Sequence, residues 1–148
     1  EEQYRRIMGV NTDAGFFLSQ AALPHLLESS GCIVNLASSA GVSGVAFNAA
    51  YCMSKGAVVQ LTRAMAVELA RTPVRVNAIA PGAVDTPMVA NLEFPDDVDI
   101  ELVMRSAAPG RAPATPDQVA DLVAFLVSPA ASAMNGAILT MDGGATAG

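Results

Sequence analysis

Two short apolar runs separated by a long helical pattern limit this chain to an α/β fold. The runs CIVNLA (Cys32–Ala37) and VRVNAIA (Val74–Ala80) are apolar at nearly every position, which suits strands of a parallel sheet covered on both faces. Apolar residues recur at helical intervals before, between and after these runs. Strands that alternate with long helices favour a parallel α/β sheet. Helices are expected over residues 1–29, 48–71 and 115–127, and a last strand over residues 137–141.

The composition is that of one globular domain and argues against several classes of partner. Of 148 residues, 52% are hydrophobic and 15% are charged, so residues 1–148 can bury a substantial core as a single domain. A formal charge of −6 argues against binding to nucleic acid or to an anionic membrane surface. The chain has no run of about 20 apolar residues that could span a bilayer, and no secretory signal. Two cysteines, Cys32 and Cys52, make no disulfide framework, so the cytoplasm is the expected location.

The segment Ser38–Lys55, SSAGVSGVAFNAAYCMSK, contains the residues best suited to chemistry. Tyr51 and Lys55 are four residues apart on a predicted helix, so their side chains share one face. A tyrosine hydroxyl has a reference pKa of about 10, and a fixed ammonium one turn away favours the phenolate and lowers that value. Tyr51 could then exchange a proton with an oxygen on a substrate carbon. Ser38 follows the first strand, at the edge where open α/β sheets bind ligands, and could hydrogen-bond the same oxygen.

Each of these residues also has a purely structural interpretation. An isolated Tyr-x-x-x-Lys pattern is more often a helix surface than a site, and Ser39 rivals Ser38 at the end of the strand. Asn11 lies inside the first helical pattern, where asparagine is a mediocre helix former. His25, the only histidine, follows Pro24 near the end of that helix and is interpreted as a surface residue. With one histidine and two cysteines, no metal site is expected.

Four motifs and one asparagine together resemble the short-chain dehydrogenase/reductase family over nearly the whole chain. The asparagine is Asn11, and the motifs are GCIVNLASSAG (Gly31–Gly41), YCMSKGAV (Tyr51–Val58), VRVNAIAPGAVDTPM (Val74–Met88) and MDGG (Met141–Gly144). The resemblance implies the carboxyl-terminal part of a Rossmann-like, doubly wound parallel sheet, with about three strands and long flanking helices. It also implies an NAD(P)-dependent oxidoreductase that moves a hydride between the cofactor and a carbonyl or secondary alcohol substrate.

The resemblance further implies roles for individual residues. Tyr51 acts as general acid/base, while Lys55 lowers its pKa and holds the nicotinamide ribose, so both also contact the cofactor. Ser38 orients the substrate oxygen and is preferred to Ser39 because its offset from Tyr51 matches the family. Asn11 lies at a helix distortion and supports a proton relay to the lysine. The cofactor is NAD or NADP, without a preference, and homo-dimers or homo-tetramers form through the two long helices and the last strand.

The second half of the chain is expected to hold the nicotinamide and cover the substrate. By resemblance, the loop after the second strand meets the nicotinamide carboxamide, and residues 89–114 form a substrate lid. A turn followed by a helix start is the structural alternative for this loop. The lid's acidic residues lack apolar surroundings and are interpreted as a solvated helix face. The loop residues are Pro81, Gly82, Val84 and Thr86, and the acids are Asp96, Asp97, Asp99 and Glu101.

Two sequence signals near the carboxyl terminus have structural interpretations. Thr115 followed by Pro116 is typical of an N-cap with proline in the first helical turn. Asp142, before Gly143 and Gly144, is interpreted as a turn residue rather than a catalytic acid.

A dinucleotide also needs a glycine-rich turn at a helix N-terminus for its pyrophosphate. No G-x-G-x-x-G occurs in this sequence, and in the resembling family that motif lies ahead of the matched region. The chain is therefore expected to be the carboxyl-terminal portion of a longer dehydrogenase. The alternative hypothesis is a truncated, non-catalytic module that acts in binding or oligomer assembly.

Overall fold

A single parallel sheet runs through the centre of the protein. The computed structural model describes residues 1–91, 94–108 and 110–147. The strands lie in the order β1-β2-β3, and both strand pairs are parallel, so all three carboxyl ends lie at one edge. This confirms the predicted parallel α/β architecture. The strands are β1 (Cys32–Leu36), β2 (Arg75–Pro81) and β3 (Ile138–Met141).

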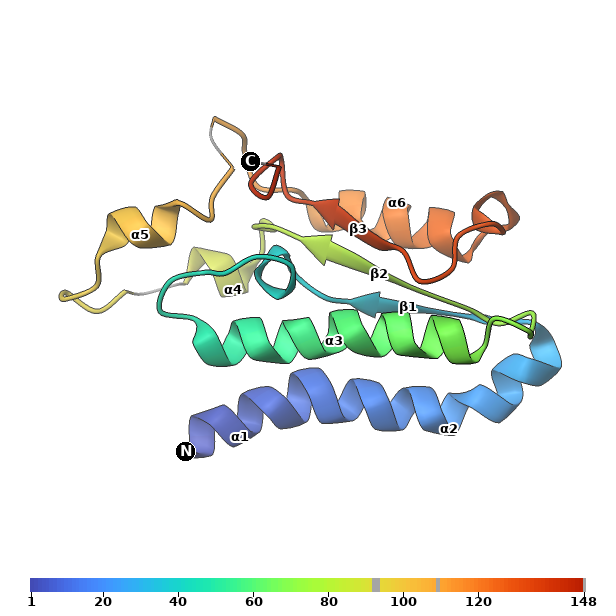
Figure 1. Ribbon diagram of the computed structural model, residues 1–148. Coiled ribbons are helices and arrows are strands. Elements are labelled where there is room, and N and C mark those ends of the chain that lie inside the picture. The colour runs from blue at the N-terminus through green and yellow to red at the C-terminus, as the bar shows by residue number, and fades with distance from the viewer. Residues whose placement is uncertain (92–93, 109, 148) are drawn as a thin grey trace.

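Helices cover both faces of the sheet, as the doubly wound prediction requires (Figure 1). Helix α1 (Glu2–Met8), the π-helical turn η1 (Gly9–Asp13) and α2 (Ala14–Ser29) follow one another without a break. They lie beside α3 (Ala49–Glu68) on one side of the sheet, and α6 (Pro116–Val127) lies on the other. None of the helices within the described ranges is long and apolar enough to cross a membrane. The short elements are the 3₁₀ turns η2 (Ser39–Gly41) and η3 (Pro129–Ala131), and the helices α4 (Pro87–Ala90) and α5 (Ile100–Met104).

Strand β2 is the centre of the core because it has a neighbour on each edge and helices on each face. Ala78 and Ala80 pack with Val58 of α3 on one face, while Ile79 packs with Leu126 of α6 on the other. All four β2 residues from 77 to 80 are fully buried. The alternation follows from the two-residue period of a strand, which sends successive side chains to opposite faces. The near-continuous apolar run in the sequence is therefore explained by burial on both sides.

The face of α3 that meets the core differs from the predicted one. The apolar spacing predicts a stripe of Val58, Leu61, Met65 and Leu69. Val58 and Leu69 are buried as predicted, with Leu69 just beyond the helix, whereas Leu61 and Met65 are only half-buried. Four of the five buried positions of the helix form a row four residues apart, Ser54, Val58, Thr62 and Ala66, and the fifth is Val59. A core residue may be polar where its hydroxyl finds a partner, as that of Thr62 does at the carbonyl of Val58, 2.8 Å away.

The end of α2 also differs in detail from the sequence pattern, in which Gly31 is the expected residue that ends the helix. Pro24 lies inside the helix, which continues to Ser29. The left-handed residue that ends it is Ser30, with φ of 54°, rather than Gly31. Gly31 is needed for another reason, since a Cβ there would stand 2.5 Å from the Cδ2 of Leu26. The glycine therefore permits close packing, and the left-handed turn falls on the serine before it.

The start of α6 and the end of β2 were predicted to within one residue. Thr115 caps α6 in a full capping box, with its hydroxyl accepting from the Gln118 amide and the Gln118 side chain accepting from the Thr115 amide. Strand β2 begins and ends one residue later than predicted. Its carboxyl end includes Pro81 because this residue still pairs with Met141 of β3. The Gly82 amide then donates to the Met141 carbonyl at 3.1 Å. The chain therefore leaves the sheet at Gly82.

Candidate active site

Ser38 lies directly past the carboxyl end of β1 and begins the turn η2. The Ala37 amide before it still donates to the Ile79 carbonyl at 2.8 Å, so the serine is held at the sheet edge. The Ser38 Oγ accepts a hydrogen bond from the Ala40 amide at 3.2 Å, which makes it the N-cap of η2. A hydroxyl has one proton and two lone pairs. Its proton is not used in this contact, so Ser38 can donate to an oxygen at the sheet edge.

Close backbone packing brings η2 against helix α3. A Cβ at Gly41 would stand 2.6 Å from both the carbonyl carbon and the carbonyl oxygen of Lys55, and 3.0 Å from the Gly56 nitrogen. Only glycine can occupy this position without a backbone shift. The contact fixes the turn that begins at Ser38 next to the turn of α3 that carries Tyr51 and Lys55.

Lys55 points from α3 toward the end of β1. Its Nζ donates to the Leu36 carbonyl at 2.9 Å and lies 5.9 Å from the centroid of the Tyr51 ring. Burial lowers the pKa of the Lys55 ammonium from its ordinary value of 10.5, because desolvation disfavours the charged form. Tyr51 itself is 36% exposed. The structure thus brings Ser38, Lys55 and Tyr51 to one edge of the sheet, with Tyr51 accessible to a small molecule.

Asn11 lies in the middle of the π-helical turn η1, where the first long helix is distorted. Single π turns inserted in α-helices are rare and occur frequently at functional sites. The Asn11 Nδ2 donates to the Ser54 Oγ of α3 at 3.1 Å, and the Thr12 Oγ1 donates to the Ser54 carbonyl at 3.3 Å. Ser54 was not among the predicted site residues. Its position between Tyr51 and Lys55 was the available signal, but an apolar-stripe interpretation of the helix passes over serine.

The loop after β2 presents its polar groups at the same sheet edge. A Cβ at Gly82 would lie 3.0 Å from the Cα of Asp142, so this loop runs closely past the turn that follows β3. Val84 pairs with Ala114 in an isolated parallel bridge, which fixes the loop from its other side. The Thr86 Oγ1 donates to the Val84 carbonyl at 3.3 Å, and Thr86 is the N-cap of α4. The four predicted cofactor-loop residues therefore form one short, firmly held segment.

The predicted lid, residues 89–114, begins and ends close to this loop. The Asp85 amide donates to the Ala114 carbonyl at 2.8 Å, and the Ala114 amide donates to the Ala83 carbonyl at 3.0 Å. These two hydrogen bonds tie the carboxyl-terminal end of the predicted lid to the loop after β2. Residues 92–93 and 109 of the predicted lid lie outside the described residues.

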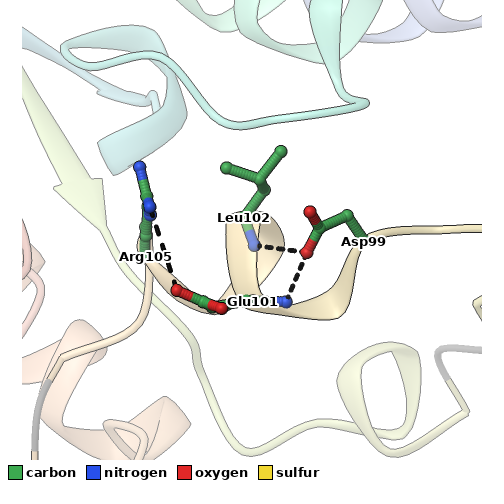
Figure 2. Close-up of polar contacts among 4 residues, drawn as sticks. All are labelled: Asp99, Glu101, Leu102 and Arg105. Atoms are coloured by element: carbon green, nitrogen blue, oxygen red, sulfur yellow. Dashed lines mark hydrogen bonds and ion pairs between the residues drawn. The ribbon is translucent and has the colours of Figure 1, made fainter.

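The acidic residues of this segment lie on the surface, as the sequence suggested. Asp99 caps α5, with its Oδ1 accepting from the amides of Glu101 at 3.1 Å and Leu102 at 3.2 Å (Figure 2). Glu101 forms an exposed ion pair with Arg105 at 3.9 Å. Exposed pairs of this kind contribute little to stability. The roles visible for Asp99 and Glu101 are therefore local to α5.

The turn after β3 is held by Asp142, as expected of a structural residue. Its Oδ1 accepts from the Gly144 amide at 3.0 Å, and its Oδ2 accepts from the amide and the hydroxyl of Thr146. The hydrogen bond from the Thr146 hydroxyl is the main reason that the pKa of the Asp142 carboxyl lies below its usual range. The three donors and both acceptor oxygens belong to residues 142–146, so the aspartate stabilises its own turn.

Comparison with known proteins finds similarity over the whole length of the chain. A family model described as enoyl-(acyl carrier protein) reductase matches residues 1–146. A meso-2,3-butanediol dehydrogenase of Serratia marcescens is 47% identical over 99% of this chain and 57% of its own length. A 2-(R)-hydroxypropyl-CoM dehydrogenase of Xanthobacter autotrophicus is 43% identical over 99% of this chain and 58% of its own length. The chain thus spans somewhat more than half the length of these relatives.

A solved structure supports the same relationship. The 3-ketoacyl-(acyl-carrier-protein) reductase from Brucella melitensis, complexed with NADH, superposes with a TM-score of 0.85 at 32% identity. The match covers 99% of this chain and 59% of the reductase chain. The three-stranded sheet with helices on both faces is therefore an arrangement that the reductase shares.

Proposed function

Because the chain belongs to the short-chain dehydrogenase/reductase family, we propose that the protein is an NAD(P)-dependent oxidoreductase acting on a carbonyl or secondary alcohol. The observation that carries the proposal is the packing of Gly41 against Lys55, which joins Ser38 to the helical turn of Tyr51 and Lys55. A hydroxyl donor, a partly exposed phenol and a desolvated ammonium then lie together at the ligand-binding edge of a parallel sheet. That combination suits proton exchange with a substrate oxygen.

The three side chains act on one oxygen atom in the proposed reaction. Tyr51 donates its hydroxyl proton to the carbonyl oxygen during reduction and accepts a proton from the alcohol during oxidation. Ser38 donates its free hydroxyl proton to the same oxygen and so fixes the position of the reacting carbon. Lys55 presents its ammonium near the Tyr51 ring and stabilises negative charge there.

The residues of the edge fit the nicotinamide end of a dinucleotide. When bound, the nicotinamide ring supplies or accepts the hydride. The Lys55 ammonium can bind the hydroxyls of its ribose, while the Val84 backbone and the Thr86 hydroxyl can bind its carboxamide. The described residues contain no glycine-rich phosphate turn of the G-x-G-x-x-G kind, and no step is assigned to the pyrophosphate. The choice between NAD and NADP is left open.

The proposed substrate is a small secondary alcohol or the ketone derived from it. Two relatives carry names for dehydrogenases of such alcohols, meso-2,3-butanediol and 2-(R)-hydroxypropyl-CoM. The reductase with NADH is named for a 3-ketoacyl substrate, which makes an acyl-thioester ketone the second choice. In both cases the oxygen that Ser38 and Tyr51 would contact lies on a secondary carbon.

Association and location follow as parts of the same proposal. Apolar side chains of α2 and α3 are solvent-exposed, with Phe17 at 61%, Leu18 at 70% and Val67 at 77%, which supports a homo-dimer or homo-tetramer. Cys32 and Cys52 are both free, which supports a reducing compartment such as the cytoplasm.

The proposal is tested with the full-length protein that contains this chain. NAD⁺ and NADP⁺ reduction is followed with a panel of small secondary alcohols and vicinal diols, and NADH and NADPH oxidation with the matching ketones and a 3-ketoacyl thioester. Primary alcohols of equal carbon number are the control. We expect turnover of at least one secondary alcohol or ketone. No turnover in either direction, together with no binding of NADH or NADPH in a fluorescence titration, would contradict the proposal.

A further inference from the structure

Ser54 is a completely buried serine at the point where the distorted first helix touches α3. Its relative exposure is 0%. The Ser54 Oγ accepts from the Asn11 Nδ2 at 3.1 Å and donates to the Tyr51 carbonyl at 2.8 Å. One hydroxyl thus links the π-helical turn to the backbone of Tyr51, and the next residue along the chain is Lys55.

A second hydrogen bond converges on the same residue. The Thr12 Oγ1 donates to the Ser54 carbonyl at 3.3 Å. Two consecutive residues of η1 therefore contact one residue of α3, one through its side chain and one through its backbone. The two bonds fix both the height and the rotation of α3 relative to η1. Neither bond could form with a residue of another turn of α3 without moving Tyr51 and Lys55.

The same helix contains a comparison for this arrangement. The Thr62 Oγ1 accepts from the Asn35 Nδ2 at 2.9 Å and donates to the Val58 carbonyl at 2.8 Å. Thr62 is also 0% exposed, so its chemistry and burial match those of Ser54. It lies two turns farther along α3 and joins the helix to β1. If buried hydroxyls in α3 serve only to satisfy polar groups, the two pairs should behave alike.

We propose that Ser54 is a positioning residue for the reaction, through which Asn11 and the π-helical turn hold the Tyr51–Lys55 turn in place. The inference rests on the proposed dehydrogenase function and deepens it. Ser54 touches no substrate atom. Its hydroxyl bonds the Asn11 amide on one side and the Tyr51 backbone on the other, so its loss removes one hydrogen bond from each group at once.

The test compares Ser54→Ala and Asn11→Ala, singly and together, in the full-length protein. We expect Ser54→Ala to lower kcat about tenfold, since small misplacements of reacting groups reduce rates strongly, with KM changed less than twofold. The pH profile of alcohol oxidation should also change, because Lys55 directly follows Ser54 and its ammonium is no longer held in the same place. The double variant should be no slower than the slower single variant, because groups that act through one contact are not additive.

Thr62→Val and Asn35→Ala supply the matched control, measured for both kcat and thermal stability. We expect these variants to lose stability while kcat stays within twofold of the parent and the pH profile does not move. If Ser54→Ala fails to fold, Ser54→Cys replaces it, since a thiol keeps a donor and an acceptor at this position but forms much weaker hydrogen bonds.

Three results would overturn the inference alone while leaving the dehydrogenase proposal intact. The first is an unchanged kcat and pH profile in the folded Ser54 variant. The second is a double variant whose loss of kcat equals the product of the losses in Ser54→Ala and Asn11→Ala. The third is a fall of kcat in Thr62→Val as large as that in the Ser54 variant. An inactive parent protein would instead overturn the proposed function together with the inference. The two failures are therefore distinguishable.

Discussion

The backbone at Gly41 lies so close to Lys55 that a Cβ on the glycine would stand 2.6 Å from the lysine carbonyl carbon. This contact joins two segments that are fourteen residues apart in the sequence. It sets the distance between the turn after β1 and helix α3, and hence between the Ser38 hydroxyl and the turn of Tyr51. The geometry of the candidate site therefore depends on a position that has no side chain.

Gly41→Ala is expected to destabilise the protein by about 1–3 kcal/mol, the usual cost of forcing an extra methyl group into a packed interior. It should also lower turnover in the full-length protein, because η2 must move away from α3. Gly44→Ala is the control, since a Cβ there has no neighbouring atom within 4 Å. Urea unfolding and steady-state kinetics measure the two effects. Equal stability and activity in the two variants would contradict this account of the contact.

Lys55 is the only lysine among residues 1–148, and its ionisation can be followed by side-chain NMR once its signal is assigned. Burial lowers its pKa, and the titration midpoint should therefore lie below the ordinary 10.5. Between the lowered pKa and 10.5 the unfolded chain binds more protons at this site than the folded chain. The contribution of Lys55 to the free energy of unfolding should consequently rise with pH across that window.

Lys55→Met should remove this rise, which urea unfolding at several alkaline pH values can measure. Arg63→Met, at an exposed position of α3, is the control because arginine does not titrate in this range. A lysine midpoint at or above 10.5, or a pH dependence in Lys55→Met equal to that of the parent, would show that the site does not desolvate the ammonium.

Thr146→Val is expected to make the protein more sensitive to acid. The Thr146 hydroxyl is the main cause of the lowered pKa of the Asp142 carboxyl, so its removal should raise that pKa toward 3.8. Stability from this carboxylate is present above the unfolded pKa and is lost as the pH falls through the folded pKa. Thr146→Val should therefore lose this contribution to stability at a higher pH than the parent protein does. NMR titration of Asp142 and the midpoint of acid unfolding provide the test, and Thr140→Val, at an exposed position of β3, is the control. Identical unfolding midpoints in Thr146→Val and the parent would contradict the prediction.

Much of the fold could be predicted because its signals are local. The apolar runs at Cys32–Ala37 and Val74–Ala80 owe their composition to burial on both faces, so they identified the parallel strands. Thr115 and Gln118 form a capping box whose residues are three apart, which a sequence displays directly. Tyr51 and Lys55 share one helix and could be paired from spacing alone.

The remaining features depend on contacts between distant residues. Ser54 and Thr62 occupy the buried row of α3 because partners from η1 and β1 satisfy their hydroxyls, and a search for apolar side chains chose Leu61 and Met65 instead. The left-handed residue at the end of α2 is Ser30, while Gly31 packs closely against the Leu26 side chain. The roles of the lid and of the loop at Thr86 came from the family resemblance and stay predictions.

The central claim is that Tyr51 exchanges the proton in a nicotinamide-dependent reaction, and one pair of variants tests it most directly. The chain has two tyrosines, so Tyr4→Phe, at an exposed position of α1, is a matched control for Tyr51→Phe. Both are measured in the full-length protein with the best alcohol or ketone of the panel, beside a circular dichroism check of folding. The account predicts that Tyr51→Phe lowers kcat by about 10²–10⁴-fold, the usual contribution of a general acid/base, while Tyr4→Phe retains parent activity. Near-normal turnover in folded Tyr51→Phe would contradict it.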